Sequence, residues 1–293
     1  KQGKGPGEYV YVEDFTIDCK NQLIYVLGVK RVHVFDFQGA FLRSFPTIDE
    51  LRFHQIDLKN DNLYFPTGIG FELMEQKWEW FKTDLDGTLI HRQQNVIEDF
   101  KPVVWYRSKL CFEKDNDIFY WNQLNDTIFK INGEIEPAFL FAKDKNRITK
   151  SDFSSADNFR NKPSWQLISV LGASRFLILE YILIKDGKRI YTVFDTLKNS
   201  LYELNSTELS TDPQLLNSFD GGPCYMPKSE FSINDEGWLA SWIHAYHLKV
   251  LIESDEFKNS TPKYPEKKKE LKKLADSLSE NDNPVLMLVK LKK

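Results

Sequence analysis

The sequence predicts an all-β fold of the propeller type, and three observations lead to this prediction. A pattern of short strands separated by turns recurs five times along the 293 residues. The turn positions Asp36, Asp84 and Asn132 follow one another at steps of 48 residues, which lies in the range of propeller blades. No sustained helical period interrupts the pattern before about residue 257. A single repeated domain over residues 1–293 therefore explains the length better than two ordinary domains do.

Each copy consists of runs rich in β-branched and aromatic residues, bounded by typical turn residues. In the first copy, the expected strands are residues 24–27, 31–37 and 40–45. The strands expected in the other copies are residues 63–65, 78–84 and 88–90; 110–112, 117–121 and 127–133; 176–179, 189–195 and 200–202; and, less regularly, 237–242 and 247–252. The later steps, of 63 and 59 residues, predict loop insertions near residues 149–165 and 206–226.

Three further segments have their own patterns. Leu271, Leu274 and Leu278 recur at helical spacing after Pro265, so one amphipathic helix is predicted over about residues 265–279. The apolar run 285–291 predicts a strand that closes a propeller ring by pairing into a blade begun at the other end of the chain. The stretch 167–184 is interrupted by charged residues and by a Gly-Ala-Ser turn, which predicts two strands instead of a membrane span.

Composition excludes several classes of function. The net charge of −4 gives no indication of binding to nucleic acid, and we expect no such partner. Cys19, Cys111 and Cys224 are far apart, so we interpret them as buried or half-buried thiols, with one disulfide left open as the alternative. The sequence has no HExxH, GxSxG, P-loop or strand-borne GxGxxG motif. His33, His54 and His91 share no spacing, and we expect neither a metal nor a cofactor.

Three motifs point to a known family. GKGPGEY at residues 3–9, NDTIF at residues 125–129 and DNPVLM at residues 282–287 resemble recurrent motifs of the six-bladed β-propeller lipoproteins of gut Bacteroidetes. The resemblance spans the chain and implies a six-bladed propeller with NHL-like repeats, exported and tethered in the cell envelope by a lipid anchor. The function of that family is largely unassigned, so the resemblance transfers no catalytic residues.

The position of the first motif affects the expected number of blades. In the relatives, this motif follows a first blade, whereas here only a few residues precede it. We therefore expect about five blades and a closing strand in this chain, with strands of the first blade and the signal sequence upstream of residue 1. The alternative is a five-bladed ring closed on residues near 9–12.

Aromatic side chains next to polar ones are the candidate ligand-binding residues. In an extended strand, Trp242, His244 and Tyr246 would share one face and could stack on a sugar or peptide. Trp78 and Trp80 would likewise share a face of strand 77–83. For both sets, packing between blades is the structural alternative.

The first predicted insertion supplies the other candidates. Arg160 and Trp165 lie there with Asp152 and Asp157, and an arginine and an acid beside a Trp could bind a charged ligand. A solvated loop is the alternative.

The sequence favours a non-enzymatic binding module, anchored in the envelope, that takes a glycan or a peptide at one mouth of the propeller. A hydrolase or lyase with acids and His at the channel mouth is the first alternative. A scaffold in an envelope complex is the second. We expect a monomer that contacts the membrane only through an upstream lipid anchor.

Overall fold

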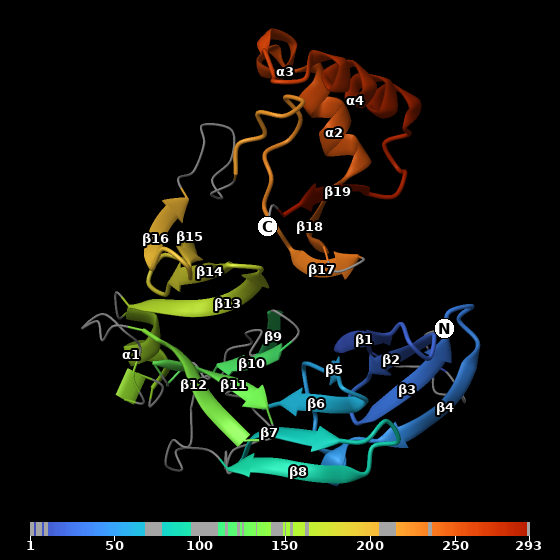
Figure 1. Cartoon of the computed structure of the whole chain (residues 1–293), viewed down its shortest axis with the longest axis vertical. Helices are drawn as coiled ribbons and strands as arrows, with labels where there is room; N and C mark the ends of the chain where they lie inside the picture. The colour runs from blue at the N-terminus through green and yellow to red at the C-terminus, as the bar shows by residue number, and fades with distance from the viewer. Residues whose placement is uncertain are drawn as a thin grey trace. The chain divides into compact units, whose positions relative to one another are not determined.

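Five antiparallel sheets make up most of the computed structural model (Figure 1). The structure describes residues 3, 8, 11–67, 78–94, 111–114, 117–121, 124, 126–132, 134–141, 149, 151–152, 155–161, 164–204, 215–233 and 236–291. The strands are, in sheet order, β1(Asp14–Asp18), β2(Leu23–Leu27), β3(Arg31–Asp36) and β4(Phe41–Pro46); β5(Asp57–Lys59), β6(Asn62–Pro66), β7(Trp78–Thr83) and β8(Leu89–Gln94); β9(Cys111–Lys114), β10(Asp117–Trp121), β11(Thr127–Asn132) and β12(Glu134–Leu140); β13(Trp165–Ala173), β14(Phe176–Leu183), β15(Arg189–Asp195) and β16(Ser200–Leu204); and β17(Ser229–Ile233), β18(Glu236–Ile243) and β19(Val285–Lys290).

In every sheet, strands that are neighbours in the chain are also neighbours in the sheet. This meander is the blade unit of β-propellers, so the predicted all-β propeller fold is confirmed. The chain divides into two compact units, residues 1–170 with 181–188 and residues 171–180 with 189–293. The stretch 167–184 forms β13 and β14, joined by a turn in which Ser174 has a φ of 52°, as the predicted pair of strands requires.

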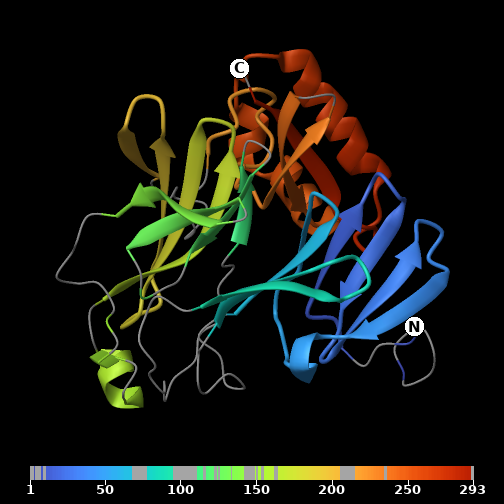
Figure 2. The same ribbon diagram turned by 60° about the horizontal axis from the view of Figure 1, so that its bottom comes forward.

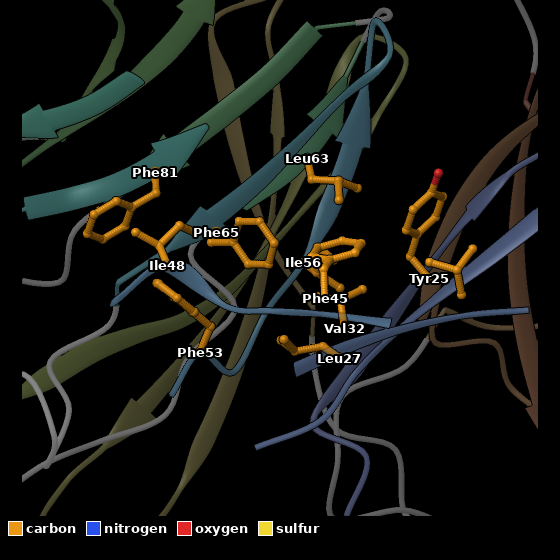
Figure 3. Packing of buried hydrophobic residues seen from close by; sticks show 11 residues of the cluster. Tyr25, Leu27, Val32, Phe45, Ile48, Phe53, Ile56, Leu63, Phe65 and Phe81 are labelled. Carbon is orange, nitrogen blue, oxygen red and sulfur yellow. The ribbon is translucent and has the colours of Figure 1, made fainter. Parts of the chain in front are cut away.

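The core of the first unit lies between its first two sheets. Tyr25 and Leu27 on β2 are paired with Val34 and Val32 on β3, and all four side chains are fully buried. The facing layer is aromatic, because the ring of Phe53 lies 5.1 Å from that of Phe65 and 5.5 Å from that of Phe81. Figure 3 shows side chains of both layers, from Phe81 and Phe65 to Tyr25 on β2.

The second unit carries three helices, α2(Ala245–Glu253), α3(Asp255–Asn259) and α4(Pro265–Ser277), which lie beside β18 and β19 in Figures 1 and 2. The predicted helix at 265–279 is confirmed as α4. The strand predicted at 247–252 is wrong, because these residues belong to α2. Leu248 and Ile252 of α2 form a helical stripe that packs with Phe257 and Ala275, and this buried stripe overrides the β-branched composition.

The strand predicted at the C-terminus is confirmed as β19. β19 pairs with β18, with Trp242 opposite Leu286 and Trp238 opposite Lys290. Among the described residues it is therefore the third strand of the fifth sheet, next to β18. It lies there because the turn at residues 280–282 returns the chain from α4 alongside β18. Most of residues 1–10 lie outside the described residues, so the predicted pairing with the other end of the chain stays a prediction.

The predicted insertions contain short structures of their own. Residues 156–161 form the helix α1(Ala156–Asn161), and Leu215 and Tyr225 form an isolated bridge within the second insertion. The three cysteines are free thiols: Cys19 is exposed, Cys111 is buried and Cys224 is intermediate.

In the part of the chain that the structure describes, no helix has the length and apolar character needed to cross a bilayer.

The aromatic layer makes a testable prediction about stability. Replacing Phe53, which is 1% exposed, by alanine is expected to lower the free energy of unfolding by about 3–5 kcal/mol, because it leaves a cavity between two sheets. The matched control is Phe37→Ala, since Phe37 is 45% exposed and its loss should change stability by less than about 0.5 kcal/mol. Urea unfolding of both variants gives the comparison, and equal losses would contradict the assigned core.

Candidate functional site

The structure separates the residues expected on one face near position 244. β18 ends at Ile243, His244 is the N-cap of α2 and Tyr246 lies in its first turn. The shared strand face predicted for Trp242, His244 and Tyr246 is therefore wrong. A different group of rings forms, because His247 lies 5.9 Å from His244 and 5.5 Å from Tyr246, centroid to centroid. Trp242 remains 43% exposed, with the Lys228 Nζ 4.0 Å from the centre of its ring.

Trp78 and Trp80 do not form a platform. A register shift between the two residues indicates a β-bulge, which directs their side chains differently. Trp78 packs against the core of the first unit, with its ring 6.4 Å from Phe81. Trp80 is 1% exposed, and its ring lies 5.1 Å from His91. Packing accounts for both residues.

The first insertion also gives little support for a shared site. Arg160 is exposed on α1, and Trp165 is the first residue of β13. Asp152 is buried and accepts hydrogen bonds from the N–H (2.6 Å) and the Oγ1 (2.8 Å) of Thr149. Asp152 thus stabilises its own turn.

The strongest polar cluster of the described residues lies instead beside β1. The side chain of Glu13 is 1% exposed and accepts hydrogen bonds from two side chains. Oε1 of Glu13 lies 2.7 Å from the Nε and 2.5 Å from the Nη2 of Arg52, and Oε2 lies 2.8 Å from the Nδ1 of His54. The side chains of Arg52 and His54 are 29% and 34% exposed. One buried carboxylate therefore holds two partly exposed cationic or donor groups side by side.

Core residues alternate with the residues of this cluster along segment 51–56, which leads into β5. Phe53 and Ile56 are each 1% exposed and belong to the aromatic and aliphatic core, whereas Arg52 and His54 reach Glu13. The N–H of Ile56 donates to the Oδ2 of Asp14 at 3.1 Å, next to Glu13 in the chain. The cluster is consequently fixed to two sheets at once.

The same segment reaches the third sheet. The amide of Gln55 donates from Nε2 to the carbonyl of Cys111 (2.9 Å) and accepts from the N–H of Cys111 (3.2 Å). On β5, the Lys59 Nζ lies 3.3 Å from an oxygen of Glu113 on β9. Polar side chains of segment 51–59 thus link β1, β5 and β9, the first strands of three sheets.

The electrostatics of the cluster keep Glu13 charged. Burial by itself would raise its pKa, but the hydrogen bonds and positive charges of His54 and Arg52 outweigh burial, so the pKa of Glu13 lies below its ordinary value of 4.5. Because an ionised carboxylate only accepts hydrogen bonds, Nδ1 of His54 carries the hydrogen and Nε2 is left for another partner.

Of the three residues of this cluster, the sequence pointed only to His54. The sequence groups His54 only with His33 and His91, whereas its partner in the structure is Glu13, which also binds Arg52. Glu13 lies 39 residues from Arg52, and no local motif connects two such residues. Among the described residues, no three His, Cys, Asp or Glu side chains are grouped so that they could hold a metal ion.

A comparison with family models shows which family the chain belongs to. Residues 1–290 match the model described as Domain of unknown function (DUF4934). The chain belongs to this family. The match includes all five sheets and the Glu13–Arg52–His54 cluster, and the description of DUF4934 names no activity. A search of the curated proteins found no match.

One solved structure supports the fold of this DUF4934 chain, and two others resemble it more distantly. A crystal structure from Bacteroides fragilis NCTC 9343, named "Putative exported protein", has a TM-score of 0.66 at 17% identity and covers 99% of this chain and 80% of that chain. The WD40 domain of Neurospora crassa Pan2 gives 0.42 at 8% identity, covering 78% of this chain and 56% of that chain. A catalytically inactive virginiamycin B lyase from Staphylococcus aureus gives 0.40 at 11%, covering 77% and 61%. Only the first likeness is close enough to support the fold.

The lowered pKa of Glu13 makes the cluster a source of pH-dependent stability. A carboxyl group whose pKa is lower in the folded state stabilises that state above its unfolded pKa, and the stabilisation is lost as pH falls through the folded pKa. We expect the difference in unfolding free energy between the wild type and Glu13→Gln to be largest above about pH 5 and to shrink below pH 4.5, the ordinary value. Urea unfolding at pH 3.5, 4.5 and 7 measures it. A difference that stays constant with pH would contradict the paired, ionised state of Glu13.

Proposed function

We propose that this chain is an exported, non-enzymatic binding module that takes up a glycan or a peptide at the Glu13–Arg52–His54 cluster. The observation that carries the proposal is the pair of exposed donors on one buried carboxylate. A guanidinium has five N–H donors, and the two contacts with Glu13 use two of them. In the described part of the chain, neither the other Arg52 donors nor the His54 Nε2 have a hydrogen-bond partner.

Preorganisation supports binding at this place. Segment 51–56 is fixed at both ends: the Thr47 Oγ1 donates to the carbonyl of Leu51 (2.6 Å), and Ile56 binds Asp14. Phe53 anchors the middle of the segment in the core. A ligand would therefore meet donors whose positions are already set, which lowers the entropic cost of association.

An enzymatic role is the second candidate, because a carboxylate that orients an imidazole is an arrangement used by general bases. A nucleophile is also needed for many such mechanisms. Among the described residues, no hydroxyl or thiol is hydrogen-bonded to His54. The geometry therefore supports binding better than catalysis.

Export is proposed from the solved relative, whose name describes an exported protein of Bacteroides fragilis. Location in the cell envelope, with a lipid anchor upstream of residue 1, would bring the cluster into contact with extracellular glycans and peptides.

Arrays of glycans and peptides, probed with the wild type and with single variants, test the proposed function. Arg52→Ala removes charged hydrogen bonds worth about 1.5–3 kcal/mol each, so we expect affinity for any ligand found to fall by about 10- to 100-fold. Arg43→Ala is the matched control, because Arg43 also pairs with one carboxylate, Asp86 at 2.8 Å, elsewhere in the first unit. We expect this control to bind like the wild type. Equal binding by Arg52→Ala and the wild type, or binding to no probe on either array, would contradict the proposal.

A further inference from the structure

The outer edge of the fifth sheet has the properties of an interface between two copies of this chain. We propose that β19 pairs antiparallel with β19 of a second copy, so that the fifth sheets of both copies form one continuous sheet. This dimer is independent of the Glu13–Arg52–His54 cluster and differs from the monomer that the sequence alone led us to expect. Three observations carry the inference: the composition of β19, the direction of its backbone groups and the charges at its two ends.

β19 is apolar and exposed although it lies at the edge of its sheet. Among the described residues, its only neighbouring strand is β18 (Figure 1). Residues 285–289 are all apolar, and three of their side chains are exposed: Leu286 (59%), Leu288 (45%) and Val289 (41%). A row of unpaired backbone groups with apolar side chains is a template for pairing with another strand.

The last strands of the other four sheets are protected against such pairing. Each has a charged residue or a proline in its interior: Arg43 in β4, Arg92 in β8, Pro137 in β12 and Glu203 in β16. β4, β8 and β12 also shift register against their neighbours, which indicates bulges. Charges, prolines and bulges are the features by which natural edge strands avoid pairing. β19 has no charge before Lys290, no proline and no register shift against β18, so among these five strands it alone is open to a partner.

The ladder with β18 fixes which backbone groups of β19 point outward. The N–H of Leu291 donates to the carbonyl of Gly237 (2.9 Å). Together with the register of β18 and β19, this bond makes Leu286 and Leu288 non-hydrogen-bonded positions, so their N–H and C=O groups point away from β18. A second β19 that runs antiparallel, with Leu286 opposite Leu288 of the other copy, meets these groups with its own. The same register pairs leucine with leucine across the two strands.

The charges at the two ends of β19 favour a second copy as the partner. Glu280 and Asp282 are exposed in the turn before β19, and Lys290 ends the strand. In an antiparallel pair, the start of each strand meets the end of the other. Lys290 of each copy therefore lies beside the acidic turn of the other copy, whereas a parallel pair would bring like charges together. The edge is thus complementary to itself, as a two-fold symmetric interface requires.

Sedimentation velocity of the full chain, over a series of protein concentrations, tests the proposal. We expect the wild type to sediment as a dimer. Leu288→Lys places a charge in the paired edge and should raise the dimer dissociation constant at least about 10-fold. Leu42→Lys is the matched control, because Leu42 is 51% exposed on β4, the last strand of the first sheet, and this variant should remain dimeric. Thermal unfolding checks that both variants are folded.

A cross-link gives a second measurement that does not depend on the lysine variant. With Leu286 opposite Leu288, the two copies of Met287 form a non-hydrogen-bonded pair, whose Cα atoms are about 4.5 Å apart and within the range of a disulfide. Met287→Cys should therefore give a disulfide-linked dimer under mild oxidation. The wild type, in which Cys19 is an exposed thiol, and the control Leu42→Cys should not.

The outcomes distinguish the possible occupants of this edge. A wild type that is monomeric at every concentration, or a dimer that Leu288→Lys leaves intact, would overturn the proposal. If the protein is monomeric and Leu288→Lys lowers its free energy of unfolding far more than Leu42→Lys does, β19 pairs with a segment of its own chain instead of a second copy. None of these results affects the binding proposed at the Glu13–Arg52–His54 cluster, because the arrays read it out separately.

Discussion

The packing of segment 51–56 between the first two sheets is the interaction on which the fold of the first unit and its candidate site both depend. Phe53 and Ile56 fill the core, while Arg52, His54 and Gln55 make the polar contacts. A four-stranded sheet can bury an apolar face only against another layer. Because the same six residues complete that layer and carry the donors, the position of the donors is set by core packing and not by a flexible loop.

Burial of the Glu13 carboxylate carries a desolvation cost, which its contacts with Arg52 and His54 outweigh. Removing a charge from water costs several kcal/mol, which a paired ion recovers only with good geometry and further hydrogen bonds. Glu13 meets that condition with contacts to both Arg52 and His54. An apolar residue could fill the same space without that cost. The charged arrangement is thus consistent with the recognition proposed for this cluster.

Several elements show which parts of the fold the sequence patterns predict and which they do not. Turn spacing located most strands of the first four sheets, and Leu271, Leu274 and Leu278 located α4. The patterns missed β1 and β5, the first strands of their sheets, and β12, the last strand of its sheet. β5 has only three residues, two of them charged, so no alternation is visible. Residues 247–252 have the composition of a strand but form a helix, because Leu248 and Ile252 find partners on α3 and α4. Trp78 and Trp80 diverge because of a bulge that alternation does not reveal.

The sequence by itself determined the all-β class, the repeated sheets and the C-terminal helix, because these follow from local periodicity and turn residues. Tertiary structure alone decided that β19 pairs with β18 in the fifth sheet and that Glu13 meets Arg52 and His54. The reason is distance along the chain: 41 residues separate Glu13 from His54, and only the packing of one sheet on the next brings them into contact. Aromatic residues such as Phe53, Phe65 and Phe81 fill those layers, while the donors that form the candidate site are common polar residues.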